Sequence, residues 1–140
     1  MESGEPVREH PMKVTVAGTT SDGSLEAGDG WIDMDVKWLV TSRSVGAEQT
    51  VFGITVFPPG AQHEIHRHPN VEETEYIVKG SGVAQVGEDD VELEAGELVF
   101  VPRNEYHGFH NTSDDVAVML WCYAGAGSLE GAGYIRREDD

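Results

Sequence analysis

The apolar residues of this chain recur with a period of two over short segments, which is the repeat of a β-strand. In the segment WIDMDVKWLV, residues 31–40, apolar and polar side chains alternate, so it predicts one strand with a buried and an exposed face. Similar runs follow in TVFGITVF, EYIVKG, ELVFVP and DDVAVMLWCYAG, and glycine or proline separates them. This arrangement of short, punctuated strands is typical of an all-β sandwich or barrel.

Helix is expected to be scarce, because no window of helical length shows an apolar period of 3.6 residues. A weak helical turn is indicated only in GSLEGAGY, residues 127–134. The sequence VGEDD, residues 86–90, has the glycine and acidic residues of a hairpin turn between two strands.

The net charge of the chain limits the kinds of molecule that it is expected to bind. The chain has 140 residues with 26 acidic and 9 basic side chains, a formal net charge of −17. Such a chain repels nucleic acid and anionic membrane surfaces, so neither is expected as a partner. Cys122 is the single cysteine, which excludes an intramolecular disulfide, and no segment has the charge and apolar run of a signal peptide or a membrane span. We therefore expect a soluble, cytoplasmic, one-domain protein.

Histidine and glutamate gather in HEIHRHPNVEETEY, which holds three of the six histidines. Residues two apart in a strand point to the same side, so His66 and His68 project together. Pro69 ends that strand, and after the turn Glu73 can face the two imidazoles from the next strand. His107 offers a fourth donor from a distant segment. The alternative at this point is a set of surface histidines that binds no metal.

The four candidate ligands belong to two sequence motifs that each begin with a glycine. The first consists of Gly60, His66, His68, Glu73 and Gly80. The second consists of Gly96, Pro102, His107 and Asn111, with Asn104 at a position where glycine is usual. In both spacing and residue type the chain resembles the cupins. Asparagine is the non-glycine residue that best accepts a positive φ, so the departure at residue 104 leaves the turn intact.

The resemblance implies a cupin β-barrel, a double-stranded β-helix or jelly-roll of two antiparallel sheets. It also implies that His66, His68, Glu73 and His107 are metal ligands in the barrel mouth. We expect the barrel to span residues 13–126, after a flexible arm of residues 1–12 and before a C-terminal turn and acidic tail of residues 127–140.

Three imidazoles and one carboxylate leave one or two positions open on an octahedral dication. Such an ion stabilises a negatively charged oxygen on a bound molecule. Nitrogen and oxygen ligands suit Fe(II) or Mn(II), which we favour, and also Ni(II), Co(II) and Zn(II). The cofactor expected is one divalent transition metal per chain.

Strand alternation places further side chains near that ion. If Glu73 points inward, Glu75 and Ile77 do so as well, and Glu75 is then a candidate catalytic base. The alternative is a Glu75 that is solvated at the rim or paired with Arg67 or Arg103. Phe109, two residues after His107, is expected to contact a substrate together with Ile77.

His63 and His110 have the opposite parity from the ligands. A surface or interface role is therefore expected for both of these histidines.

Three functions remain open. A dioxygenase that uses the metal is favoured, and a non-oxidative lyase, isomerase or epimerase with Glu75 as base is the first alternative. A small-molecule or metal-binding module without catalysis is the second. The acidic surface favours a neutral substrate, enolisable or phenolic, over an anionic one. A homodimer is implied by the resemblance, and residues 12–20, MKVTVAGTT, are the candidate for an exchanged strand.

Overall fold

The computed structural model describes residues 9–140, and the first eight residues of the expected arm lie outside the described part. Its strands are β1 (Trp31–Ile32), β2 (Asp35–Val40), β3 (Thr50–Phe57), β4 (Gln62–Arg67), β5 (Glu72–Lys79), β6 (Ser81–Val86), β7 (Asp89–Glu94), β8 (Leu98–Val101), β9 (His107–His110), β10 (Ala117–Ala124) and β11 (Ile135–Arg136). Two single-turn helices, α1 (Ser42–Val45) and α2 (Leu129–Ala132), and two 3-10 turns, Ala27–Asp29 and Arg137–Asp139, complete it.

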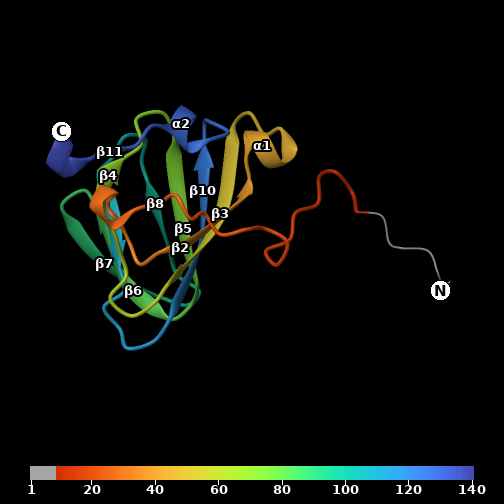
Figure 1. Ribbon diagram of the computed structural model, residues 1–140. Helices are drawn as coiled ribbons and strands as arrows, with labels where there is room; N and C mark the ends of the chain where they lie inside the picture. Colours follow the sequence, from red (N-terminus) through yellow and green to blue (C-terminus); the bar gives the residue numbers. More distant parts are fainter. Residues whose placement is uncertain (1–8) are drawn as a thin grey trace.

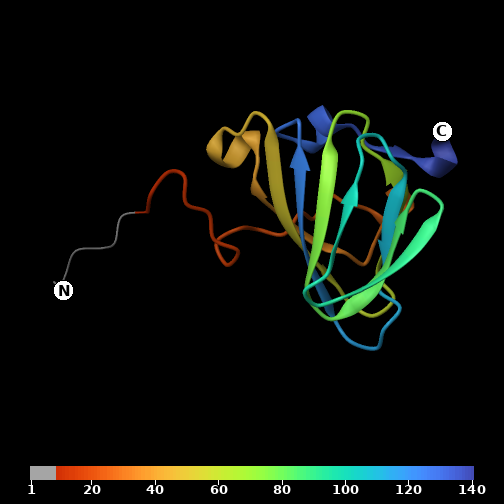
Figure 2. The same ribbon diagram turned by 180° about the vertical axis from the view of Figure 1, so that it is seen from behind.

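The strands form two facing antiparallel sheets (Figures 1 and 2). One sheet has the order β1-β4-β9-β6-β7, with β11 added beside β4, and the other has the order β2-β3-β10-β5-β8. This is the jelly-roll that the resemblance to the cupins implies, and helix is as scarce as expected. None of the helices in residues 9–140 has the length and apolar character needed to cross a bilayer.

The core lies between the sheets and is made by the alternate, inward side chains of both. In β3 the pattern is regular, with every second residue from Val51 to Phe57 buried. The largest fully buried apolar side chains are Phe57, Phe109, Ile77, Val36, Val51, Val71 and Val101. The expected hairpin at residues 86–90 and the helical turn near residue 130 are both confirmed.

The prediction of a single strand over residues 31–40 is wrong, because the structure has two strands there, β1 and β2. Asp33 adopts a positive φ of 58°, which turns the chain between β1 and β2 and sends the two strands to different sheets. The pairing of β2 with β3 also shifts register between Trp38 and Val40, and Leu39 is buried at that bulge. A local backbone turn of this kind overrides alternation, because each inserted residue inverts the two faces.

Asn104 has a φ of 67°, the left-handed conformation expected of it. Its side chain also accepts a hydrogen bond from the Arg67 guanidinium, with 2.5 Å between nitrogen and oxygen. The turn before β9 is thereby fastened to the end of β4, the strand that carries the first histidines.

Candidate metal centre

Four side chains from three strands and one turn meet inside the barrel. His66 lies in β4 opposite His107 in β9, His68 follows the end of β4, and Glu73 lies in β5. Each of the four can offer one ligand atom, and these atoms all lie within 4.8 Å of one another. All four residues are buried. The structure therefore brings together the four residues that the sequence selected.

Backbone carbonyls fix how the imidazole rings face. Nδ1 of His66 lies 2.6 Å from the Glu64 carbonyl oxygen, Nδ1 of His68 lies 2.6 Å from that of Gly133, and Nδ1 of His107 lies 2.9 Å from that of Glu105. A carbonyl can only accept, so each Nδ1 donates and each neutral ring keeps its lone pair on Nε2. This is how proteins orient metal-binding histidines.

The Nε2 atoms of His66 and His68 are buried and have no hydrogen-bond partner in the described structure. A buried nitrogen lone pair without a partner costs free energy, and a metal ion is a partner that these atoms accept. The donor set therefore fits a divalent transition metal with three imidazole nitrogens and one carboxylate oxygen. The identity of that metal does not follow from the residues, since several dications share this preference.

Charge in the cluster is concentrated on Glu73 and His107. Burial disfavours the Glu73 carboxylate, but His107, with Nε2 2.9 Å from Oε1, and His68 outweigh it and hold the pKa of Glu73 well below its usual range. Burial likewise opposes a charge on His107, yet the same carboxylate raises the pKa of that imidazole. Burial and the neighbouring histidines lower the pKa of His66. Without an ion, these shifts favour an ion pair between Glu73 and His107 and a neutral imidazole on His66.

Glu75 lies one pleat further along β5, and only 5% of it is exposed. Its Oε1 has no hydrogen-bond partner in the described structure. Burial first, and then the Glu73 carboxylate, raise the pKa of Glu75 well above its ordinary value near 4.5.

The alternative readings of Glu75, a solvated rim position or a pair with an arginine, are wrong. Arg67 pairs with Asp140, and Arg103 donates to the Asn70 carbonyl. Whether Glu75 acts as a base stays a prediction.

A small cavity of about 20 Å³ adjoins these carboxylates. Phe109 lines it, while Ile77 is fully buried in the core and is not among the lining residues. The remaining lining residues are Trp31, Met34, Thr55, Phe57, His63, Glu73, Glu75, Met119, Trp121 and Tyr123. A volume of this size holds one or two water molecules and no organic molecule of ordinary size.

The surface role expected for His63 is wrong. The pairing of β4 with β9 shifts register between His63 and His66, so the bulge turns His63 toward the same side as the ligands. The His63 ring stacks on that of His66 at 3.9 Å between centroids and lies tilted against Trp31 at 4.1 Å. Its Nε2 is buried and has no hydrogen-bond partner in the described structure. His110, by contrast, stays outside the cluster and is half-buried.

The end of the chain closes this part of the barrel. Tyr134 lies 5.0 Å from the rings of both Trp31 and His66, and its hydroxyl donates to the Asp29 carbonyl. β11 pairs with β4 beside His66, and Gly133 supplies the carbonyl that orients His68. No pattern in the sequence links residues 133–136 to the histidines, so this part of the site could be found only in three dimensions.

The fold and the 3-His/1-Glu cluster define a cupin, and comparison with known proteins agrees. A family model described as Cupin domain matches residues 53–123, more than half of the chain. The chain therefore belongs to the cupin family.

Protein SchB of Streptomyces halstedii is 34% identical over 89 residues, which are 62% of this chain and 63% of that protein. The tetracenomycin polyketide synthase protein TcmJ of Streptomyces glaucescens is 36% identical over 83 residues, 59% of this chain and 56% of that protein. The matches thus span less than two thirds of the length of these curated relatives.

Two solved structures share the fold. The polyketide cyclase RemF of Streptomyces resistomycificus has a TM-score of 0.71 at 21% identity, covering 96% of this chain and 89% of that one. A protein of Thermotoga maritima described as a predicted oxalate decarboxylase has a TM-score of 0.68 at 22% identity, covering 81% and 99%. At such identities the likeness is one of fold alone.

Proposed function

We propose that this protein is a metal-dependent enzyme in which Glu75 moves a proton on a small organic molecule held beside the ion. The observation that carries the proposal is the placement of Glu75. It is a second buried carboxyl on the same strand face as the ligand Glu73, in a cavity lined mainly by apolar and aromatic side chains. A carboxyl that is enclosed in this way, with one oxygen unpartnered, is positioned to exchange a proton with a molecule that reaches the ion.

The roles of the other residues follow from their positions. His66, His68, His107 and Glu73 would hold the ion, which supplies Lewis-acid stabilisation of a negative oxygen when it is bound. Phe57, Phe109 and Met119 line the cavity and give the two carboxyls an apolar surround. The non-oxidative reaction thereby becomes the first candidate, whereas the sequence alone favoured a dioxygenase.

The names of two curated relatives support this order, since TcmJ is a tetracenomycin polyketide synthase protein and CurC of Streptomyces cyaneus, 30% identical over 87 residues, is a polyketide synthase. Ring closure of a polyketide requires proton removal from an enolisable carbon, and polyketide products are often phenolic. We propose a substrate of that chemical class for this protein, neutral before it binds, and Fe(II) or Mn(II) as the ion.

A dioxygenase is the second candidate, and the size of the cavity favours it. About 20 Å³ next to the ligands is room for a diatomic molecule. This candidate predicts oxygen consumption with an enolisable or phenolic substrate, and an electron paramagnetic resonance signal when nitric oxide is added to the ferrous protein. If neither is observed, the oxidative reaction is excluded.

The proposal is tested by proton exchange, which does not require the natural product to be known. Metal-loaded protein is incubated in D₂O with a panel of 1,3-diketones and polyphenols, and NMR follows the loss of protons from the carbon acids. We expect catalysed exchange for part of the panel, and a fall of about 10²-fold or more in Glu75→Gln with unchanged metal content.

Full exchange activity in Glu75→Gln contradicts the role of this carboxyl. Metal-loaded protein that exchanges nothing and consumes no oxygen would instead favour the binding module.

A further inference from the structure

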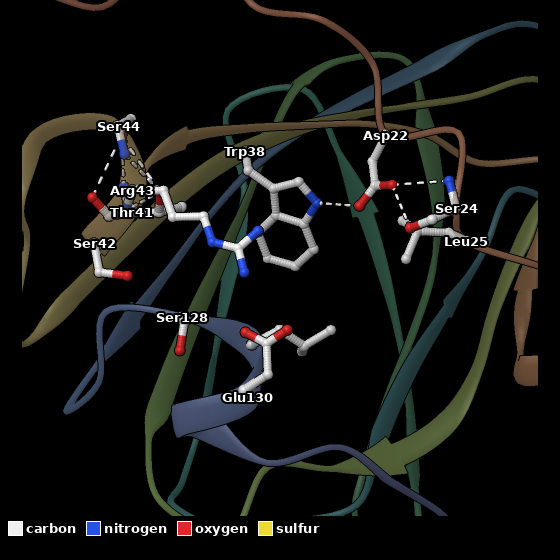
Figure 3. Close-up of a pocket in the computed structure, with 11 residues that line it drawn as sticks. Asp22, Ser24, Leu25, Trp38, Thr41, Ser42, Arg43, Ser44, Ser128 and Glu130 are labelled. Carbon is white, nitrogen blue, oxygen red and sulfur yellow. Dashed lines mark hydrogen bonds between the residues drawn. The ribbon is translucent and has the colours of Figure 1, made fainter.

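A groove on the described part of the chain lies outside the barrel cavity. It has a volume of about 430 Å³, within the ordinary range for a small-molecule site. Two segments face each other across it, the end of β2 with α1 on one side and α2 on the other (Figure 3). Its lining residues are Asp22, Ser24, Leu25, Trp38, Thr41, Ser42, Arg43, Ser44, Ser128, Leu129 and Glu130.

Trp38 forms the apolar floor of this groove, and its orientation is fixed. The indole Nε1 donates to Asp22 Oδ2 at 2.8 Å. The other oxygen of Asp22 accepts from the amide and the hydroxyl of Ser24, so the carboxylate that holds the indole is itself held. A preoriented aromatic face loses little conformational entropy when a flat molecule stacks on it.

The groove also carries opposite charges that are available to a ligand. Arg43 and Glu130 stand on its two sides, and no hydrogen bond joins the Arg43 guanidinium to the other lining residues (Figure 3). A guanidinium donates and a carboxylate accepts, so a hydroxyl group can satisfy both. Together with the indole, this pair matches a flat aromatic molecule that bears hydroxyl groups.

Aromatic side chains that contact one another separate the groove from the metal centre. Trp38 contacts Trp121, which lines the inner cavity, with 5.0 Å between ring centroids. Trp38 also lies 6.5 Å from Tyr123, which in turn lies 4.8 Å from the ring of the ligand His68. The inner cavity, at about 20 Å³, cannot hold an aromatic molecule, whereas the groove beside it can.

We infer that this groove is the docking site for the organic substrate, a neutral phenolic aromatic molecule whose ring stacks on Trp38 and whose hydroxyl group bridges Arg43 and Glu130. The inference deepens the proposed function and rests on it for the identity of the ligand as a substrate. The site itself lies on side chains that the metal centre does not use. Between a docked molecule and the ion lie the Trp38 indole, which is hydrogen-bonded to Asp22, and the Trp121 and Tyr123 rings that pack against it.

The test uses 2-naphthol as a probe and the full chain labelled with ¹⁵N. The chain has three tryptophans, so its indole N–H groups give three resolvable NMR signals. We expect 2-naphthol to shift the Trp38 signal and to leave that of Trp31 in place. Trp38→Ala and Arg43→Gln should each weaken binding about tenfold, because one removes the platform and the other the cation.

Arg137→Gln is the matched control, since Arg137 is exposed and lies outside the groove. It should bind the probe as the unmodified chain does. Two results overturn the inference: absence of binding, and binding that shifts the Trp31 signal but not that of Trp38. Failure of the proposed function gives a different result, in which the probe binds at Trp38 while the metal-loaded protein catalyses no proton exchange.

Discussion

Replacing Glu75 with glutamine tests the burial of this carboxyl without any knowledge of the substrate. In the metal-free protein, burial and the neighbouring Glu73 raise the pKa of Glu75 well above 4.5, so the folded chain keeps the proton. The unfolded chain releases it as the pH rises past about 4.5. Rising pH therefore favours unfolding. The stability that the protonated carboxyl preserves is complete below about pH 4.5, and it decreases as the pH rises from there to the pKa of Glu75 in the folded state. Glutamine cannot ionise and avoids this loss.

The size of the effect follows from linkage. One proton held by the folded but not the unfolded chain changes the free energy of unfolding by about 1.4 kcal/mol for each pH unit. For 140 residues the entropy of unfolding is about 290 cal/mol/K, so this corresponds to about 5 °C in Tm per unit. Titration of the histidines is nearly common to both proteins and largely cancels in the difference.

Urea unfolding of the metal-free chain at pH 5, 6, 7 and 8 measures the difference. We expect the stability of Glu75→Gln relative to the unmodified chain to rise with pH at up to about 1.4 kcal/mol per unit. Glu72→Gln, on the exposed face of the same strand, is the matched control and should show no such rise. A difference that is independent of pH would refute the burial of Glu75 against Glu73.

Three further predictions concern the ion and the core. A dication at 100 times its Kd should stabilise the unmodified chain by about 2.7 kcal/mol, which calorimetry would record as a rise of about 9 °C in Tm. His110→Ala should show the same rise in Tm, and His68→Ala should not. An equal rise in His68→Ala would contradict the assigned ligands. Bound metal should be lost between about pH 6.5 and 5, because the imidazoles must be neutral to ligate, and retention well below pH 5 in dialysis would argue against three histidine ligands. Gly82→Ala should cost about 1–3 kcal/mol, since the added Cβ would collide with Phe109 and lie 2.8 Å from the His110 carbonyl oxygen. Gly23→Ala, where the added Cβ meets nothing within 4 Å, is its control, and equal stability of the two variants in urea would count against the packing described.

The parts of this site that could be predicted from the sequence are those governed by spacing. His66 lies in β4 and His68 follows two residues later, just past the end of that strand, so alternation predicted that both face Glu73, and Pro69 begins the turn between them and β5. The positive φ of Asn104 could be expected because few other residues accept it. Local rules were sufficient at these positions.

The errors arise where the backbone departs from alternation. A bulge between His63 and His66 turns His63 inward, and the turn at Asp33 divides a strand that looked continuous. Bulges insert a residue without a reliable signature in the sequence. The closure of the barrel by Tyr134 was also missed, because it depends on contacts between segments about seventy residues apart. Tertiary packing decides such features.

The central claim is that His66, His68, Glu73 and His107 together bind one dication, and the direct measurement is metal content per chain. Protein prepared with ample iron and manganese, and analysed by mass spectrometry of the elements, should contain close to one transition-metal ion per chain. His107→Ala should contain far less, while His110→Ala should match the unmodified chain. An unmodified protein without metal, or equal metal in His107→Ala, would contradict the account.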